Sequence, residues 1–270
     1  MKIHGICLAK NEADLMEYSL RDKLSWCDFV YVYDNGSTDA TWDIARQSAA
    51  ANPARILLFR SDGKPFRDGL RGDVFNHYRD NAQPGDWWCR ADVDEFYALN
   101  PREVLAAVPA RHHVVWSIHI QYLFTELDLA RYEATAQSRI PEDLPRHYIA
   151  NYSEPRFFRH RPRLVWNESA SWPTHMGVAT PRRIPVRHYQ FRSPPQIERR
   201  LATRREAAAG GYRHFSHSQA TDWRNKIDPS SALHLDPGNG NFIIDELPPH
   251  IDPPLQRAAK RLAHGLGLWP

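Results

Sequence analysis

Three carboxylates stand within four positions of an otherwise aromatic and apolar segment, WWCRADVDEFY at residues 87–97. Asp92, Asp94 and Glu95 repel one another and are costly to desolvate unless a cation neutralises them. Asp92 and Asp94 are two positions apart, so an extended chain places both on one face. Mg²⁺ and Mn²⁺ prefer carboxylate oxygen and are commonly held by one or two protein carboxylates together with substrate phosphates. The spacing therefore predicts a divalent-cation site at the polar end of a strand.

Two other apolar runs end in polar junctions, AKNE at residues 9–12 and YDNGSTD at residues 33–39. In open α/β sheets ligands bind at the carboxyl ends of the strands, and amides and carboxylates there can bond a base or ribose hydroxyls. These junctions therefore suit a nucleotide. Helix capping is the alternative, by Asn11 in the first junction and by Ser37, Thr38 or Asp39 in the second. Neither GxGxxG nor GxxxxGK[ST] occurs, which argues against a dinucleotide fold and a P-loop.

The segments that position these residues alternate between strand-like and helix-like patterns. Strands are predicted at 2–9, 28–33, 55–60, 87–91 and 113–124, and helices at 12–24, 41–51 and 70–81. This alternation predicts an α/β fold with a mainly parallel sheet flanked by helices. Beyond about Thr125 prolines multiply and the strands become irregular. Ser193 as N-cap, Pro194 and a capping-box Gln196 predict a helix that ends at Gly210, and a short basic helix is expected over 254–265, packed on the domain or resting on a membrane surface.

Length and composition indicate a soluble globular protein of 270 residues, either one large domain or one with an appendage. We divide it into a ligand-binding half, 1–125, and a second half, 126–270, within a single domain. No apolar run reaches the length of about 18–20 residues that a membrane span needs. The N-terminus lacks a signal-peptide layout, and the three cysteines form no CxxC pair. These features predict a cytoplasmic protein, with the inner face of the membrane as an open alternative.

Positive charge is concentrated in one stretch. Between Arg156 and Arg213 there are thirteen arginines and three acidic residues, whereas the whole chain has a net charge of only +3, so the remainder is negative by seven. Such a patch could meet phosphates, an anionic membrane or nucleic acid. A solvated surface with local ion pairs is the alternative.

The three motifs together resemble the family 2-type glycosyltransferases, which have a GT-A fold. The likeness is strongest to a bacterial subgroup whose sequences carry NE, DN-S-D-T, D-DEF and HY-F-S elements. RHYQFRS at residues 187–193 matches the last of these, and the resemblance covers roughly residues 1–205. It implies a metal-dependent transferase that uses a UDP- or GDP-type nucleoside-diphosphate sugar, with inversion as the family default. A glycan or a lipid-linked glycan, as in bacterial surface polysaccharide or lipopolysaccharide, would be the acceptor, and nucleic acid would not be a partner.

The resemblance also implies roles for residues. Asp34 would contact the base, with Asn35 and Ser37 in the same element, and Asn11 and Glu12 beside the nucleotide. Asp92 would approach the ribose and the metal. Asp94 would be the ligand that links Mn²⁺ or Mg²⁺ to the diphosphate. His188 would be a further ligand, with His175 as a second candidate.

Two assignments stay open at this point. Arg71 could bind the diphosphate, although a surface position on a helix is the favoured interpretation. The general base that many family members carry in a Glu-Asp pair has no clear counterpart, because Glu142-Asp143 lies in a proline-bounded loop. Glu95, Glu154 and Glu168 are the other candidates for it.

Three competing functions remain. A nucleotidyltransferase on a related fold would release pyrophosphate, but would normally carry a basic, glycine-rich loop after its first strand. A nucleic-acid-binding protein would use the arginine-rich stretch, yet leaves the acidic cluster unexplained. A protein that binds sugars without transferring them is the third.

Overall fold

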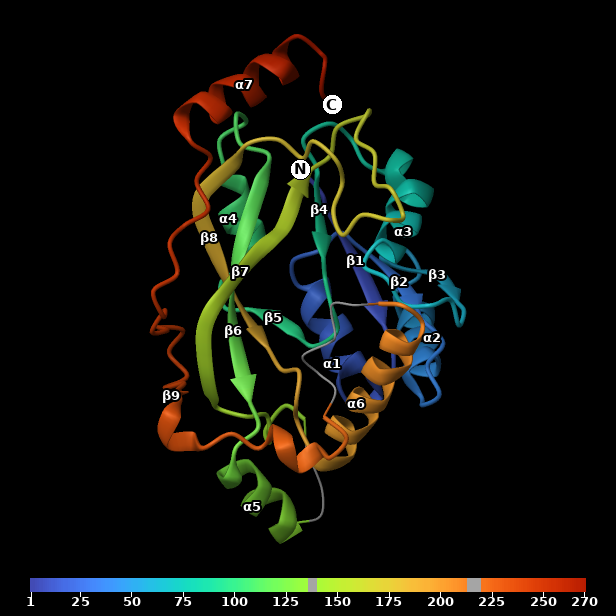
Figure 1. The fold of residues 1–270 in the computed structure, drawn as a ribbon. Coiled ribbons are helices and arrows are strands. Elements are labelled where there is room, and N and C mark those ends of the chain that lie inside the picture. The colour runs from blue at the N-terminus through green and yellow to red at the C-terminus, as the bar shows by residue number, and fades with distance from the viewer. Residues whose placement is uncertain (136–139, 213–219) are drawn as a thin grey trace.

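The computed structural model of the protein describes residues 1–135, 140–212 and 220–270. Its elements alternate in the first third of the chain and include longer strands later (Figure 1). They are β1 (Ile3–Ala9), α1 (Ala13–Leu24), β2 (Phe29–Asp34), α2 (Thr41–Ala51), β3 (Ile56–Ser61), α3 (Leu70–Tyr78), β4 (Trp87–Arg90), β5 (Glu95–Tyr97), α4 (Pro101–Ala106), β6 (Val114–Leu123), α5 (Glu126–Thr135), β7 (His147–Arg159), β8 (Ala179–His188), α6 (Pro194–Ala209), β9 (His234–Leu235) and α7 (Pro254–Gly265). Short 3₁₀ turns occupy Arg79–Asn81, Trp223–Lys226 and Ser230–Ala232.

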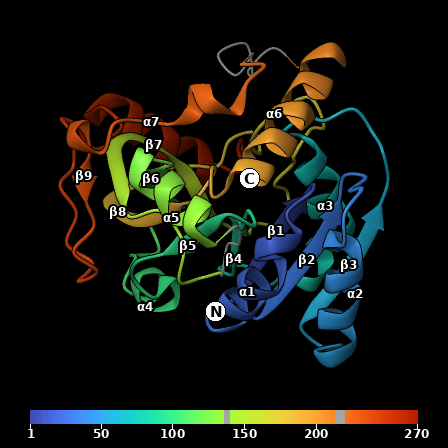
Figure 2. The same cartoon turned by 90° about the horizontal axis from the view of Figure 1, so that it is seen from below.

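The strands form one mixed sheet in the order β3-β2-β1-β4-β7-β6-β8-β5, with β9 beside β7 (Figure 2). β1 pairs in parallel with β2 and β4, and β2 pairs in parallel with β3. β7 runs antiparallel to both β4 and β6, whereas β6 and β8 are parallel. The predicted α/β class, a sheet flanked by helices, is confirmed.

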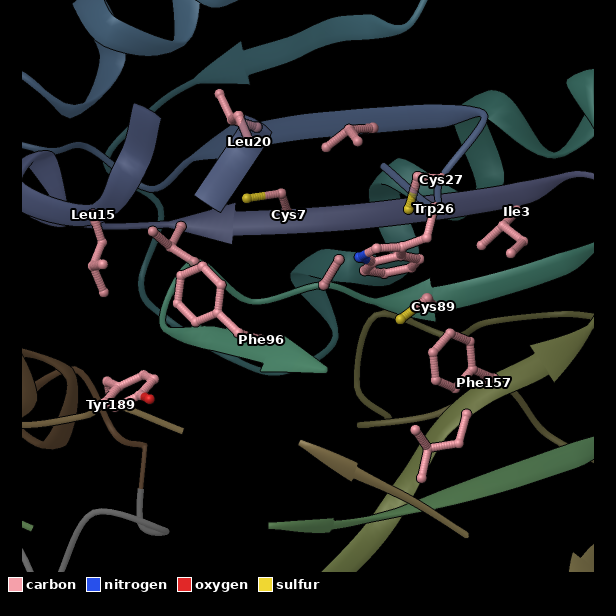
Figure 3. Packing of buried hydrophobic residues seen from close by; sticks show 14 of the residues in the cluster. Ile3, Cys7, Leu15, Leu20, Trp26, Cys27, Cys89, Phe96, Phe157 and Tyr189 are labelled. Atoms are coloured by element: carbon pink, nitrogen blue, oxygen red, sulfur yellow. The ribbon is translucent and has the colours of Figure 1, made fainter. Parts of the chain in front are cut away.

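Side chains alternate along β1 between two hydrophobic clusters, one on each face of the sheet. Cys7 and Ala9 belong to the cluster that contains α1 and α2, and Ile6 and Leu8 belong to the one that contains α3. Figure 3 shows the first cluster, in which Leu15 and Leu20 of α1 pack towards the sheet. Helices on both faces bury the parallel strands, so polar side chains reach solvent at the strand ends.

The boundaries of the early elements agree with the sequence pattern to within a residue or two. α2 spans the predicted range, and the helix predicted over 70–81 becomes 3₁₀ after Tyr78. α1 begins after Glu12, which is its N-cap residue, so the capping role considered for Asn11 is wrong. Asn11 instead adopts a left-handed φ of 57°.

The second half of the chain completes the sheet. β7 and β8 were not predicted as long strands, because Pro155, Pro181 and Pro185 interrupt their sequences. Those prolines accompany irregularities: Trp116 pairs with Pro155 and Val115 with Phe157, which leaves Arg156 as the extra residue of a bulge. β7 lies between β4 and β6, so both predicted halves contribute to one sheet.

The two helices predicted near the C-terminus are both present, and α7 has the predicted bounds. Ser193 is the N-cap of α6 and Pro194 is its first residue. The side chain of Gln196 turns back as expected, but it accepts from the backbone of Arg192 at 3.0 Å rather than from Ser193. None of the described helices has the length and apolar character needed to cross a membrane.

Candidate active site

A cavity of about 640 Å³ lies at the carboxyl ends of β1 and β4, and we call it the central cavity. Both halves of the chain line it, from the β1–α1 junction to α6. Six basic and six acidic side chains are among its lining: Lys10, Arg71, Arg90, Arg156, Arg200 and Arg204, and Glu12, Asp68, Asp92, Asp94, Glu95 and Glu154. Its volume falls in the range of roughly 300–1,000 Å³ that is usual for sites of small ligands.

Asp94 and His188 meet at the wall of this cavity. The short strand β5 pairs with the end of β8 so that Glu95 lies opposite His188, and the backbone of Tyr189 donates to the carbonyl of Asp94 at 2.9 Å. This pairing brings Nε2 of His188 to 3.3 Å from Oδ2 of Asp94. The family resemblance implies that these two residues share a site, and the structure places them together.

Arg200 of α6 connects Asp94 to the β1–α1 junction. Its two terminal nitrogens lie 2.8 Å from Asp94 Oδ2 and 2.8 Å from Glu12 Oε1. Burial alone would raise the pKa of the Asp94 carboxyl, but Arg200 and His188 outweigh it and hold that pKa well below its usual range. Asp94 is therefore a carboxylate at neutral pH. α6 is fixed in this position by Arg192, which is buried and forms ion pairs with Glu12 and Asp14.

Asp92 is neutralised by arginines on three sides. Arg71 donates to Oδ1 at 2.5 Å, Arg156 donates to Oδ2 at 3.0 Å, and Arg90 lies 3.8 Å away. Burial would raise the pKa of Asp92, yet Arg71 and Arg156 together lower it. Arg71 is only 4 % exposed, so the surface position favoured for it from the sequence is wrong. Arg71 lines the central cavity, but its positive charge is paired with the carboxylate of Asp92.

Glu95 and Glu154 share the guanidinium of Arg156, which forms ion pairs with both. Burial raises the pKa of Glu95 to about 7, against the opposing effect of Arg156. Burial would also raise the pKa of Glu154, but the positive charge of Arg156 outweighs this effect and lowers that pKa. His119 lies beside both carboxylates, with Nε2 3.5 Å from Glu154, and burial lowers its pKa to about 4. The bulge in β7 directs Arg156 into this group of charges.

The residues predicted to bind the nucleotide divide into two groups. Asn11, Glu12 and Asn35 line the central cavity, whereas Asp34 and Ser37 are not among its described lining. The Asp34 carboxylate, 1 % exposed, accepts hydrogen bonds from Ser37 and Ser61. Asp34 and Ser37 therefore hold the β2–α2 junction together and stay outside the described lining of the cavity.

Asn11 joins the two polar junctions. Its side-chain oxygen accepts from the backbone of Thr38 at 2.7 Å, and its own backbone N–H donates to Ser37 at 2.9 Å. The N-cap residue of α2 is Ala40, so the capping role considered for Ser37, Thr38 or Asp39 is wrong. Asp39 still serves that turn, since its carboxylate accepts from the backbone of Thr41 at 3.0 Å.

Three weaker candidates lie elsewhere. The ring of His175 stacks on Trp269 at 4.2 Å, and Glu168 forms an ion pair with Arg67. Glu142 lies in the turn that follows Ile140. In the described residues the lining of the central cavity includes none of these three.

Several residues of the site were not singled out from the sequence, namely Arg90, Arg156, Arg200, His119 and Tyr152. Arg90 lies over the ring of Trp172 at 4.6 Å, and both residues line the cavity. The uneven distribution of charge along the chain partly indicates these residues. The arginine-rich stretch faces the acids of the first half, through Arg156, Arg192 and Arg200.

The donor atoms present fit a hard divalent cation held jointly by protein and substrate. Asp94 supplies a carboxylate oxygen and His188 an imidazole nitrogen, and their spacing of 3.3 Å is close to the roughly 3.0 Å between adjacent ligands of an octahedral ion. Over residues 1–135, 140–212 and 220–270, no group of three or more His, Cys, Asp or Glu residues is arranged to hold a metal. Remaining ligands would therefore come from water and a bound phosphate. Asp92 is less suited, because both of its oxygens are bonded to arginines.

No protein-family model matches the sequence, and no curated protein matches it either. The structure is similar to mannosyltransferase PcManGT from Pyrobaculum calidifontis in complex with GDP-Man and Mn²⁺, with 17 % identity over 80 % of this chain and 64 % of that one, at a TM-score of 0.43. It is similar to S. aureus TarS, with 14 % identity over 80 % of this chain and 44 % of that one, at a TM-score of 0.38.

A third similar structure is glucosyl-3-phosphoglycerate synthase from Mycobacterium tuberculosis in complex with Mn²⁺, UDP and glucosyl-3-phosphoglycerate. The identity is 18 %, the match covers 44 % of each chain, and the TM-score is 0.30. This chain thus spans less than two thirds of the length of each of these proteins.

Proposed function

We propose that the protein is a glycosyltransferase that uses a nucleoside-diphosphate sugar and a divalent cation. The observation that carries this proposal is the Asp94–His188 pair, 3.3 Å apart in a cavity that also presents arginines. A carboxylate and an imidazole can bind Mn²⁺ or Mg²⁺, while basic side chains favour an anionic ligand beside it. A nucleoside diphosphate supplies the phosphate oxygens that such a partly filled cation shell needs. The motifs of the family 2-type glycosyltransferases support the same assignment.

Residues on the β1–α1 side suit the nucleoside. Asn11 and Asn35 line the cavity there with amide groups, and Glu12 lies beside them with a carboxylate held by Arg192 and Arg200. We place the base or ribose of a UDP- or GDP-type donor against these residues. Asp34 and Ser37 contribute by holding the β2–α2 junction, and Asp92 by holding Arg71 and Arg156.

The leaving diphosphate needs positive charge in the transition state. The bound cation would supply it as a Lewis acid between Asp94 and the phosphates. Arg200 and Arg204 of α6 line the same cavity, so their guanidinium groups can stabilise phosphate oxygens bidentately. We infer that Arg200 exchanges part of its contact with Asp94 for a contact with the donor.

The base that takes the acceptor proton is assigned to Glu95 or Glu154, the two glutamates that line the cavity beside Arg156. Glu154 is the more accessible, since its side chain is 17 % exposed and that of Glu95 is 2 % exposed. An acceptor hydroxyl that enters along Tyr152 and Trp172 would meet Glu154 first. Aromatic rings in this part of the lining suit a sugar ring, which is consistent with a glycan acceptor.

The finer parts of the proposal come from the family resemblance. They are transfer with inversion, membership of family 2, and a surface polysaccharide or a lipid-linked glycan as the acceptor. A cytoplasmic site of action with peripheral membrane contact belongs to the same proposal.

Nucleic-acid binding is less well supported than sugar transfer. It would use the arginine-rich stretch as an exposed surface, but Arg156, Arg192 and Arg200 point inwards and form ion pairs with acids of the first half. Those three charges are therefore not available to a nucleic-acid backbone.

The test is a thermal-shift screen of nucleoside-diphosphate sugars with and without Mn²⁺, followed by an assay for released nucleoside diphosphate. A ligand that binds only the folded protein raises its melting temperature by mass action. We expect a shift that requires both nucleotide and metal, and release of nucleoside diphosphate. Release of pyrophosphate would instead identify a nucleotidyltransferase, and the absence of a shift with every UDP- and GDP-sugar would contradict the proposal.

A further inference from the structure

Helix α7 is attached to the rest of the protein by its polar side. At 3.6 residues per turn, Arg257, Lys260 and His264 lie on one side of this helix. Lys260 donates to the buried carboxylate of Asp252 at 2.6 Å, and Nη1 of Arg161 lies 2.8 Å from Nδ1 of His264. These contacts hold the helix against the end of the sheet, where Figure 1 shows it at the top of the molecule.

The opposite side of α7 is apolar and faces solvent. We call it the α7 apolar face, and it consists of Leu255, Ala258, Ala259, Leu262 and Leu266, all of them exposed. Leu255 is 87 % exposed, Leu262 62 % and Leu266 65 %. A surface helix normally turns such a stripe towards the core, so this helix is docked the opposite way round. Contiguous exposed apolar residues mark an interaction site.

The charges around this face indicate what it binds. The segment 254–265 contains Arg257, Lys260 and Arg261 and has no acidic residue. Arg111 adds a further cation: after burial, the charges of Arg111, Arg261 and Arg257 are what lower the pKa of nearby His112. Two copies of the protein that met through this face would bring these cations together. An anionic lipid surface would neutralise them while it takes up the leucines.

We propose that α7 binds the anionic surface of a membrane as an interfacial helix. Its axis lies in the plane of the surface, the leucines enter the boundary between headgroups and acyl chains, and the exposed residues Arg261 and Arg111 contact lipid phosphates. Three leucines form a small apolar surface, so the binding is reversible and weakens as salt rises.

The position of α7 separates this contact from the central cavity. Arg161 follows β7, whose last residue, Arg159, pairs with Trp87 at the start of β4. The cavity lies at the other end of that strand, beside Asp92 and Asp94. Lipid bound at α7 therefore leaves the cavity open. The contact localises the protein and takes no part in binding the donor. It deepens the membrane contact of the proposed function and does not depend on the proposed transferase activity.

The test is cosedimentation of the full chain with vesicles of phosphatidylcholine alone or mixed with phosphatidylglycerol. We expect binding only to the mixed vesicles. The variant Leu255→Ser/Leu262→Ser/Leu266→Ser should lower the affinity by about tenfold or more, because each leucine contributes apolar area to the contact. Arg111→Gln/Arg261→Gln should weaken binding and reduce its dependence on salt. Leu127→Ser is the matched control, since Leu127 is 54 % exposed and belongs to α5, which lies at the opposite end of the molecule from α7 (Figure 1).

Circular dichroism and the shift caused by nucleotide with Mn²⁺ verify that each variant is folded and retains its cavity. The proposal is overturned if the wild type does not bind mixed vesicles at low salt, or if the leucine variant binds as well as the wild type. It is also overturned if the protein is a dimer that the leucine variant converts to a monomer, because the face would then join two copies. A wild type that binds vesicles but releases no nucleoside diphosphate would contradict only the transferase proposal.

Discussion

Nε2 of His188 lies 3.3 Å from Oδ2 of Asp94, although the strands β6 and β7 lie between these two residues in the sequence. The contact depends on backbone pairing between β5 and β8, in which Glu95 lies opposite His188. Asp94 lies in the turn directly before β5 and His188 is the last residue of β8, so the pairing of these two strands fixes both ligands. This geometry leads to a prediction about metal binding.

Removal of either ligand should weaken metal binding. We expect Asp94→Asn and His188→Ala each to lower the affinity for Mn²⁺ in the presence of UDP or GDP by about tenfold or more, since even losing a residue that only supports a ligand costs 10–100-fold. The measurement is the Mn²⁺ dependence of the thermal shift. His175→Ala is the control, because His175 stacks on Trp269 outside the cavity lining. Equal Mn²⁺ affinity in the two site variants and the wild type would exclude the assigned ligands.

Arg156 should be important for stability. It is 3 % exposed and forms ion pairs with Asp92, Glu95 and Glu154. Arg156→Gln leaves buried carboxylates without a counter-charge, so we expect the free energy of unfolding to fall by about 3–5 kcal/mol. Denaturant titration measures this change, and Arg46→Gln is the control, because Arg46 is 65 % exposed in a surface pair with Asp43.

The same region offers a test of coupling. The double variant Arg156→Gln/Glu95→Gln also removes one of the carboxylates left unpaired. The decrease in its free energy of unfolding should therefore be smaller than the sum of the decreases in the two single variants. Additive losses would show that Arg156 and Glu95 are not energetically coupled.

Gly69 should not tolerate a side chain. A Cβ atom at this position would lie 1.7 Å from the carbonyl oxygen of Glu168, so the backbone of α3 or of the 168 loop would have to move. We expect Gly69→Ala to destabilise the protein by about 1–3 kcal/mol or more, as overpacking does. Gly63→Ala is the matched control, because its Cβ would meet no other described atom within 4 Å. Equal melting temperatures for the two variants would contradict this account.

The free energy of unfolding should decrease as the pH is lowered, because the histidine His4 is buried in its neutral form. This ring is fully buried between Phe29 and Trp88, and its Nδ1 lies 2.9 Å from the hydroxyl of Tyr31. Burial lowers its pKa from 6.5 to about 4, against the opposing charge of Asp86. The unfolded chain therefore binds a proton below pH 6.5 that the folded protein excludes, and stability is lost as the pH falls from 6.5 towards 4.

The decrease in the free energy of unfolding that is attributable to His4 should reach about 3 kcal/mol at pH 4. It can be measured by comparing denaturant unfolding of the wild type and His4→Phe at pH 7.5 and pH 4.5. The aromatic replacement keeps the stacking but does not titrate, so its stability should change less between the two pH values. A change of equal size in both proteins would assign the pH dependence to other groups.

The sequence predicts the early elements and the acidic end of β4 because each depends on local pattern. Short apolar runs mark β1 and β2, and polar residues follow them where the strands end. The sequence predicts that a metal ion neutralises the acidic cluster. At Asp92, however, the guanidinium groups of Arg71 and Arg156 supply the positive charge. Those pairings arise from tertiary contacts between residues far apart in sequence, which no local pattern encodes.

The second half was less predictable for a physical reason. Proline lacks an N–H donor, so Pro155 and Pro185 argue against strands when the sequence is considered alone. The structure accommodates Pro155 beside a bulge, and the extra residue of that bulge is Arg156. The feature that hides β7 from sequence analysis thus also directs an arginine into the site.

The place of β7 in the sheet affects how the chain folds during synthesis. β1 to β4 leave the ribosome first, yet the neighbour of β4 ends only at Arg159 and must then insert between β4 and β6. Until then β4 presents an unpaired edge, and such edges are prone to association with other chains. Pairings between distant segments also form slowly, because loop closure precedes them. The edge of β4 therefore stays open to association until β7 is in place.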